Sequence, residues 1–244
     1  LRRMAWGYLK KLVISERFGI IVSSVYGNYG NYSMVGIAGA TLCYAVQLYT
    51  DFSGCMDIIG GTSVLFGITL PENFKAPFFS ETIQEFWQRW HITLGLWFKD
   101  YLMYPLQKSL FLQSVGKLAK DKLGKKRGKK IPFYLAMLIL WILIGIWHGG
   151  TGYYFIASGI LPCIMLMGSS FIQSLSARSI KLLKINTNCT SWHIFRRART
   201  LLLICICWLF VCSGSTHNAF NIIRHMVFVP WKYTTFVSSF NTFG

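Results

Sequence analysis

The sequence predicts an all-α integral membrane protein that crosses the bilayer several times. Of its 244 residues, 53% are hydrophobic and only 14% are charged, whereas soluble domains carry roughly 25% charged residues. Several apolar runs approach the roughly 20 residues that a spanning helix needs. The basic residues, which give the chain a net charge of +17, gather between these runs, as they do in cytoplasmic loops.

The chain begins with a basic and partly amphipathic segment, residues 1–17. This composition indicates a cytoplasmic or interfacial segment rather than a span. The opening Leu-Arg-Arg has no initiating Met, and no signal peptide follows it. We therefore expect the sequence to be a piece of a longer protein.

Two apolar runs follow, at about 34–50 and 55–70. Asp51 comes directly after the first run and places a carboxylate at the membrane boundary or within it. In the second run, Asp57 precedes a pair of glycines. Small residues of this kind allow two helices to approach closely in a membrane.

The most aromatic stretch is FWQRWHITLGLWFKDYLMYPL, residues 86–106, which threads Arg89, His91, Lys99 and Asp100 among seven aromatic rings. A charged side chain that faced lipid at mid-bilayer would cost roughly 2.5–3.5 kcal/mol. An interfacial or re-entrant helix, or a helix that faces a wet cavity, avoids this cost. We expect one of these arrangements here.

A basic run, residues 116–130, holds eight Lys or Arg and one Asp, which predicts a solvated cytoplasmic loop. From Pro132, a residue suited to a helix start, an apolar run continues to Trp147. At 1.5 Å per residue it covers about 24 Å, so His148 should lie well toward the opposite face. A further span at about 152–173 would complete a hairpin with HGGTG at its tip.

The rest of the chain repeats this alternation. Residues 178–199 are basic and are expected to form the next cytoplasmic loop. A last apolar run at 200–213 is short for a span and continues into 219–231. No internal repeat or low-complexity linker is present, so we expect one membrane-embedded domain over residues 1–244.

Two histidines stand out as candidates for chemistry. His148 ends an apolar run and precedes two glycines, which leave backbone room for a ligand. His91 lies within the aromatic stretch. Histidine is the usual general base near neutral pH, and ionisable groups inside a membrane are generally functional. A lone histidine at a helix end is more often structural, and His193, His217 and His225 lie in or beside polar segments.

Several other classes of site lack their sequence signatures. His91 and His148 have no paired His or Cys at zinc-binding spacing, and the one residue between Cys205 and Cys207 is too few. We therefore expect no metal, and buried cysteines rather than disulfides. No Gly-x-Ser-x-Gly string indicates a serine hydrolase. No nucleic-acid-binding signature accompanies the positive charge.

Four blocks, DFSG, PENF, RWHIT and WHG, occur in order between residues 44 and 155. In these blocks the chain resembles the membrane-bound O-acyltransferase family. The resemblance is closest to the branch of the alginate O-acetylation membrane protein and the teichoic-acid D-alanyl transfer protein. It implies spanning and re-entrant or interfacial helices around a central funnel, of which this chain would supply an N-terminally truncated form.

The resemblance also implies an activity, the transfer of an acyl group from a thioester to a hydroxyl. The histidine of the WHG block, His148, would be the catalytic residue, and that of the RWHIT block, His91, would be the second important one. The thioester, acyl-CoA or an acyl-carrier phosphopantetheine, would be a co-substrate, and no bound cofactor is expected. As a general base, His148 would contribute about 10²–10⁴-fold to the rate.

A buried tunnel that joins both membrane faces would let the donor and the acceptor meet. We expect substrate-binding side chains along it at Asp51, Arg89, Trp90, Asp100 and Trp147. Aromatic faces among them suit a pantetheine arm or a sugar ring.

The expected location is the bacterial cytoplasmic membrane, with several spans in contact with lipid. A donor or carrier protein would act from the cytoplasmic side. The acceptor would be an exported polysaccharide, and an extracytoplasmic transferase could be a partner. One alternative is D-alanyl transfer from a carrier protein to teichoic acid. Another is a transporter or structural component, with Asp57, Asp100 and His148 along an ion path.

Overall fold

The structure is a computed structural model that describes residues 1–228, apart from the side chains at 170, 171 and 173–175. In these residues the chain is helical, with one isolated β-bridge between Phe74 and Trp90. The predicted all-α class is confirmed for this part of the chain. The described residues divide into two compact units, 1–71 with 208–228, and 72–207. The single domain and the funnel stay predictions.

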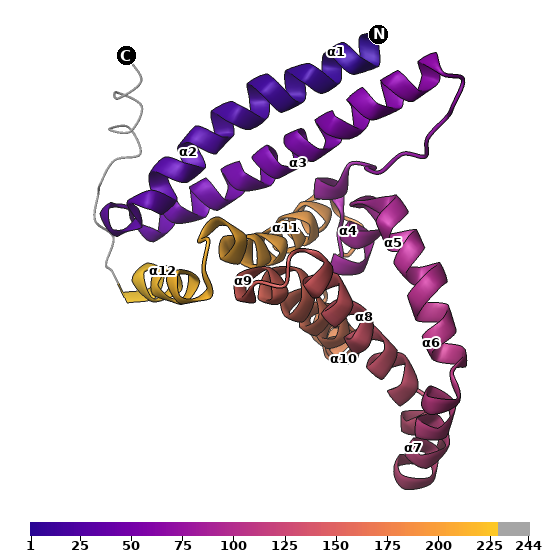
Figure 1. The fold of residues 1–244 in the computed structure, drawn as a ribbon. Coiled ribbons are helices and arrows are strands. Elements are labelled where there is room, and N and C mark those ends of the chain that lie inside the picture. Colours follow the sequence, from indigo (N-terminus) through magenta and orange to yellow (C-terminus); the bar gives the residue numbers. More distant parts are fainter. Residues whose placement is uncertain (229–244) are drawn as a thin grey trace. The chain divides into compact units, whose positions relative to one another are not determined.

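The first unit is built on a pair of long antiparallel helical rods (Figure 1). One rod is continuous through α1 (Arg2–Tyr8), the π-helix η1 (Leu9–Ser15) and α2 (Glu16–Gly27), and the other is α3 (Met34–Leu65). Glycines permit their close contact: a Cβ atom on Gly54 would lie 2.7 Å from the carbonyl oxygen of Gly7, and one on Gly61 would lie 2.5 Å from Cγ of Met4. The predicted close approach of helices is confirmed.

Helix α3 joins the two apolar runs that the sequence separates at Asp51. Glycine costs about 1 kcal/mol in a helix interior, and close packing against the first rod offsets that cost at Gly54. Asp51 accordingly lies inside a continuous helix, where its Oδ1 is 2.5 Å from Nζ of Lys11.

Asp57 lies in a second ion cluster of the same unit. Its Oδ1 accepts a hydrogen bond from Nε of Arg3 at 2.9 Å, and its Oδ2 contacts Nζ of Lys10. Nζ of Lys10 also donates to Oγ of Ser53 at 3.1 Å. Because two cations hold this carboxylate, it suits helix packing better than the ion path of the transporter alternative.

The second unit begins with the 3₁₀-helix η3 (Pro77–Phe79), α4 (Ile83–Arg89), α5 (Ile92–Phe98), the π-helix η4 (Lys99–Met103) and α6 (Tyr104–Lys108). The aromatic stretch 86–106 is therefore broken at Trp90 and His91. Its inner face reaches a hydrophobic core cluster of Phe98, Met103, Leu112, Ala136 and Leu140.

The expected loop at 116–130 is wrong, because most of it belongs to helix α7 (Leu110–Gly128). Leu112, Gly116 and Ala119 are buried at helical spacing, and lysine is a good helix former. The loop prediction relied on the charged residues and overlooked this narrow apolar face. The helix is interrupted at Gly124, where φ is 79°.

The predicted hairpin is confirmed. Helix α8 (Ile131–Trp147) has Pro132 in its first turn and packs against the segment α9 (Gly152–Phe155), π-helix η5 (Ile156–Ile160) and α10 (Leu161–Leu182). The two arms meet at glycines: a Cβ atom on Gly159 would lie 2.9 Å from the carbonyl oxygen of Trp141.

The loop prediction for 178–199 is wrong at both ends, because α10 continues to Leu182 and α11 (Thr190–Cys212) begins well before residue 199. Helix α12 (Thr216–Phe228) follows a short break. Residues 229–231 of the last predicted run lie outside the described residues.

By length and composition, one described helical segment could cross a membrane, Gly152–Ser169. Helices α7 and α8 together would also be long and apolar enough for one span, but the angle between their axes is 95°. The predicted number of spans stays a prediction.

Candidate active site

Backbone pairing positions His91 in the second unit. The segment around Asn73 runs antiparallel to the end of α4: the N–H of Lys75 donates to the carbonyl of Arg89, and that of Ile92 donates to the carbonyl of Asn73, both at 3.0 Å. Between these bonds His91 adopts φ 49° and ψ 54°. This left-handed conformation is uncommon for a residue other than glycine, and it separates α4 from α5.

The side chain of Asn73 holds the ring of His91. Its Oδ1 accepts from the backbone N–H of Thr93 at 3.3 Å and from Oγ1 of Thr93 at 2.6 Å, and it lies 3.2 Å from Nδ1 of His91. A backbone N–H can only donate, so the amide oxygen faces this group. Nδ1 of His91 must then donate to it, which leaves the lone pair of a neutral imidazole on Nε2.

His91 and His148 flank one indole, that of Trp147. The ring centroids of His91 and Trp147 are 6.4 Å apart, and those of Trp147 and His148 are 4.8 Å apart with an edge-on geometry of 78°. Phe98 contacts the same indole edge-on at 6.4 Å. His91 therefore lies beside Trp147 and His148, although more than fifty residues separate it from them in the sequence.

The turn after α8 keeps His148 accessible. Gly149 and Gly150 have φ values of 123° and 67°, which favour glycine. A Cβ atom on Gly149 would lie 4.0 Å from Cδ2 of Tyr154, and one on Gly150 would lie 3.9 Å from the carbonyl oxygen of Ile146, so the space beside the turn is also open. His148 is exposed, and no group among the described residues forms a hydrogen bond with its ring.

Both rings are expected to be neutral at pH 7. Burial, and then the nearby His148, lower the pKa of His91 to about 4. The pKa of His148 is also lowered, because the chain around it displaces part of the hydration of the ring although the residue is exposed. A neutral imidazole is the form that accepts a proton.

Two other predicted site residues of this unit, Arg89 and Trp90, have local partners. NH2 of Arg89 lies 2.6 Å from Oε1 of Glu85. Trp90 is buried at 8% exposure and stacks on Phe86 with ring centroids 5.6 Å apart, so it is part of the packing. Asp100 is exposed in η4. Asp51, paired with Lys11, belongs to the first unit. The functional roles of all seven predicted residues stay predictions.

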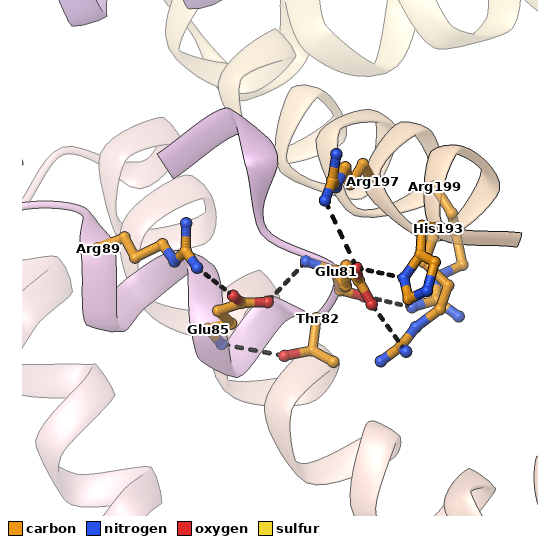
Figure 2. A network of polar contacts seen from close by, with 8 residues as sticks. Glu81, Thr82, Glu85, Arg89, His193, Arg197 and Arg199 are labelled. Carbon is orange, nitrogen blue, oxygen red and sulfur yellow. Dashed lines mark hydrogen bonds and ion pairs between the residues drawn. The ribbon is translucent and has the colours of Figure 1, made fainter. Parts of the chain in front are cut away.

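Figure 2 shows the polar network at the start of α4, the helix that leads to His91. Oγ1 of Thr82 accepts from the N–H of Glu85 at 3.1 Å, and Oε2 of Glu85 accepts from the N–H of Glu81 at 2.7 Å. This reciprocal pair is a capping box, which satisfies two donors that a helix start leaves open.

Glu81 ties this helix start to α11 (Figure 2). Its carboxylate contacts Nδ1 of His193 at 2.7 Å and NH1 of Arg196 at 2.8 Å, and its carbonyl accepts from NH2 of Arg199 at 2.8 Å. The hydrogen bond with His193, followed by the charge of Arg196, lowers the pKa of Glu81. His193 therefore has a structural partner in Glu81.

Sequence reasoning missed Asn73, Thr93 and Glu81. Asn73 lies in the PENF block and Thr93 in the RWHIT block, so the co-occurrence of these blocks was an available signal. The sequence offered no comparable signal for Glu81, because its partners lie more than a hundred residues away on α11.

Comparison with known proteins gives one matching family and several relatives. Residues 6–118 match the model of the membrane-bound O-acyltransferase family. The chain is 32% identical over 217 residues to a probable alginate O-acetylase of Pseudomonas syringae pv. tomato, covering 89% of this chain and 36% of that protein. It is 30% identical over 221 residues to a peptidoglycan O-acetyltransferase of Helicobacter pylori, covering 91% and 37%.

A third relative is a teichoic acid D-alanyltransferase of Bacillus subtilis, 31% identical over 171 residues, which are 70% of this chain and 38% of that protein. The chain thus spans little more than a third of the length of the curated relatives it matches. The relatives named here modify different polymers, but each name describes transfer of an acyl group.

Proposed function

Because this chain belongs to the membrane-bound O-acyltransferase family, we propose that it transfers an acetyl group from a thioester to a hydroxyl of an exported cell-surface polysaccharide. Two of the relatives reported above are named as a probable O-acetylase of alginate and an O-acetyltransferase of peptidoglycan, and their similarity extends over about nine-tenths of the chain. The protein would be a multi-pass component of the bacterial cytoplasmic membrane.

The observation that carries this proposal is the pair of histidines on Trp147. A hydroxyl attacks a thioester slowly unless a base takes its proton as the new bond forms. In the proposed step the acceptor oxygen bonds to the thioester carbon, and His148 takes the hydroxyl proton. The C–S bond then breaks, and the proton passes to the departing thiolate, so that an ester and a thiol are released.

His91 has a separate role in this proposal. Its Nδ1–H is directed to Asn73, so the proposed role falls on Nε2, which in this tautomer accepts hydrogen bonds. We assign it to orienting the acceptor hydroxyl or a neighbouring hydroxyl of the sugar. Trp147, between the two rings, supplies a flat apolar surface for a sugar ring or a pantetheine arm.

The donor is expected to arrive from the cytoplasm as acetyl-CoA or on an acyl-carrier phosphopantetheine, and the acceptor is expected to lie outside the membrane. Isolated membranes that contain the protein should transfer radiolabelled acetyl from acetyl-CoA to added polysaccharide. Alkaline hydroxylamine should release the label, because an O-ester is cleaved by this treatment. Label that resists hydroxylamine, or no transfer to any polymer with a hydroxyl, contradicts the proposal.

The second candidate function is D-alanyl transfer to teichoic acid, which the Bacillus subtilis relative favours. The same assay distinguishes the two when labelled D-alanine on a carrier protein replaces acetyl-CoA. Transfer of D-alanine but not acetyl would select the second candidate. Both would use the same two histidines.

A further inference from the structure

Helix α7 combines three features that no acyl-transfer step requires: an excess of basic side chains, exposed apolar residues and a right-angle junction with α8. We propose that α7 lies flat on a membrane surface, with its exposed apolar side chains inserted among lipid tails and its lysines on anionic phospholipid headgroups. The proposal rests on the membrane location of the family and not on catalysis.

The exposed apolar side chains form a second apolar face of α7. The first face, with Leu112, Gly116 and Ala119, is buried. Phe111 and Leu118 are 62% and 56% exposed, and their separation of seven residues places them on one side of the helix. This side is distinct from the buried one, so packing within the described unit leaves it open.

Basic residues are exposed on the same helix: by helical spacing Lys122 lies beside the open face, and Lys117 and Lys120 lie on other exposed sides. Residues 116–130 carry eight Lys or Arg against one Asp, and Lys117, Lys120 and Lys122 are exposed. Basic amphipathic segments next to a span attract anionic lipid headgroups. Lysine stems also extend along apolar surface while their amines reach the headgroups.

The junction with α8 gives α7 the orientation that such contact needs. The two helix axes meet at 95°, and α8 has an apolar sequence throughout. If α8 runs along the bilayer normal, α7 runs in the plane of the surface. Its basic residues then lie at the cytoplasmic face, as the positive-inside rule expects.

Close backbone packing fixes this corner. A Cβ atom on Gly116 would lie 3.0 Å from Cγ of Pro132 in the first turn of α8, and one on Gly128 would lie 2.4 Å from the backbone N of Lys120. The end of α7 therefore folds back onto its own middle. A corner of this kind holds α7 in place instead of leaving it as a flexible tether.

A soluble acidic partner or a nucleic acid would also complement the lysines. Neither explains why Phe111 and Leu118 are exposed on a helix set at a right angle to an apolar one. An anionic bilayer surface accounts for the charge, the apolar side chains and the orientation together, so we commit to it.

The test measures the depth of residue 118 in a bilayer. A nitroxide is attached to Leu118→Cys in a variant without the seven native cysteines, and the protein is placed in nanodiscs of phosphatidylcholine with or without phosphatidylglycerol. Collision with oxygen, which concentrates in lipid, is compared with collision with a water-soluble nickel complex. With phosphatidylglycerol the label should favour oxygen.

Replacing Lys117, Lys120 and Lys122 by Gln should make the label more accessible to the nickel complex. The equilibrium between membrane-bound and released α7 should shift toward release by on the order of a hundredfold. The matched control neutralises Arg178, Lys181 and Lys184, which are exposed on or just after α10, and should leave the label buried. Equal nickel accessibility in both lipid mixtures overturns the proposal. So does protection of a water-exposed label by an acidic protein or an RNA homopolymer. Either result leaves the proposed acyl transfer untouched, because no activity is measured.

Discussion

The change Asn73→Ala tests whether the orientation of His91 matters for catalysis. The substitution removes the acceptor that lies 3.2 Å from Nδ1 of His91. A neutral hydrogen bond contributes about 0.5–1.5 kcal/mol net, so the preference for the Nδ1–H tautomer falls by about 2- to 13-fold. We expect a loss of about 3- to 10-fold in kcat for acyl transfer, measured with labelled donor and corrected for folded protein.

The matched control is Thr93→Val, which removes the 2.6 Å hydrogen bond from Oγ1 to Asn73 but keeps the contact with His91. It should destabilise the fold by about 1 kcal/mol and leave kcat within about twofold, since the His91 tautomer is retained. Unchanged kcat in Asn73→Ala refutes the reasoning. An equal loss in both variants does so too, because it would indicate a purely structural role.

A second substitution at the same position reports the charge state of His91. In Asn73→Asp the carboxylate keeps the acceptor oxygen but stabilises imidazolium, so the pKa of His91 should rise from about 4. Protonated His91 has no lone pair on Nε2. The acid limb of the pH profile of kcat/KM should therefore move to higher pH than in the unsubstituted protein, and an unmoved limb contradicts this role.

Three further predictions concern the scaffold. Gly54→Ala should lower stability by about 1–3 kcal/mol, measured by thermal unfolding in detergent, because its Cβ would meet the carbonyl of Gly7; Gly27→Ala, with no atom within 4 Å, is the control and should have little effect. Gly150→Ala should cost about 1–2 kcal/mol at φ 67° and reduce acyl transfer by displacing the turn. Glu81→Gln should destabilise the fold at pH 7. Because the folded-state pKa of Glu81 is lowered, its contribution is present above the unfolded value of about 4.3 and is lost as pH falls through the folded value. The difference in unfolding free energy between the unsubstituted protein and Glu81→Gln should therefore shrink at acidic pH. A difference that stays constant with pH would contradict the ion-pair account.

Local patterns predicted the elements whose signals are strong. The proline at 132 and the uninterrupted apolar run after it identified α8, and the HGGTG tip identified the hairpin. Apolar runs without charge leave few alternatives to a helix. The same patterns failed at 116–130, where eight basic residues concealed a narrow buried face.

The site was predictable in part. Its two histidines and Trp147 were identified from the sequence, and the structure brings them together. The residue that orients His91 was not identified, because Asn73 comes close to His91 only through the β-bridge between Phe74 and Trp90, which joins two separate segments of the chain. Trp90 was expected to bind substrate, and that role stays a prediction; in the structure the side chain is buried and stacks on Phe86. Aromatic spacing alone does not distinguish packing from binding.

The central claim is that His148 takes the proton of the acceptor hydroxyl. Single-turnover acyl transfer by His148→Ala, with helical content and unfolding temperature matched to the parent protein, tests it most directly. The account predicts a loss of about 10²–10⁴-fold in the rate of ester formation. A rate within about threefold of the parent would contradict it, since a base worth so little cannot carry the step.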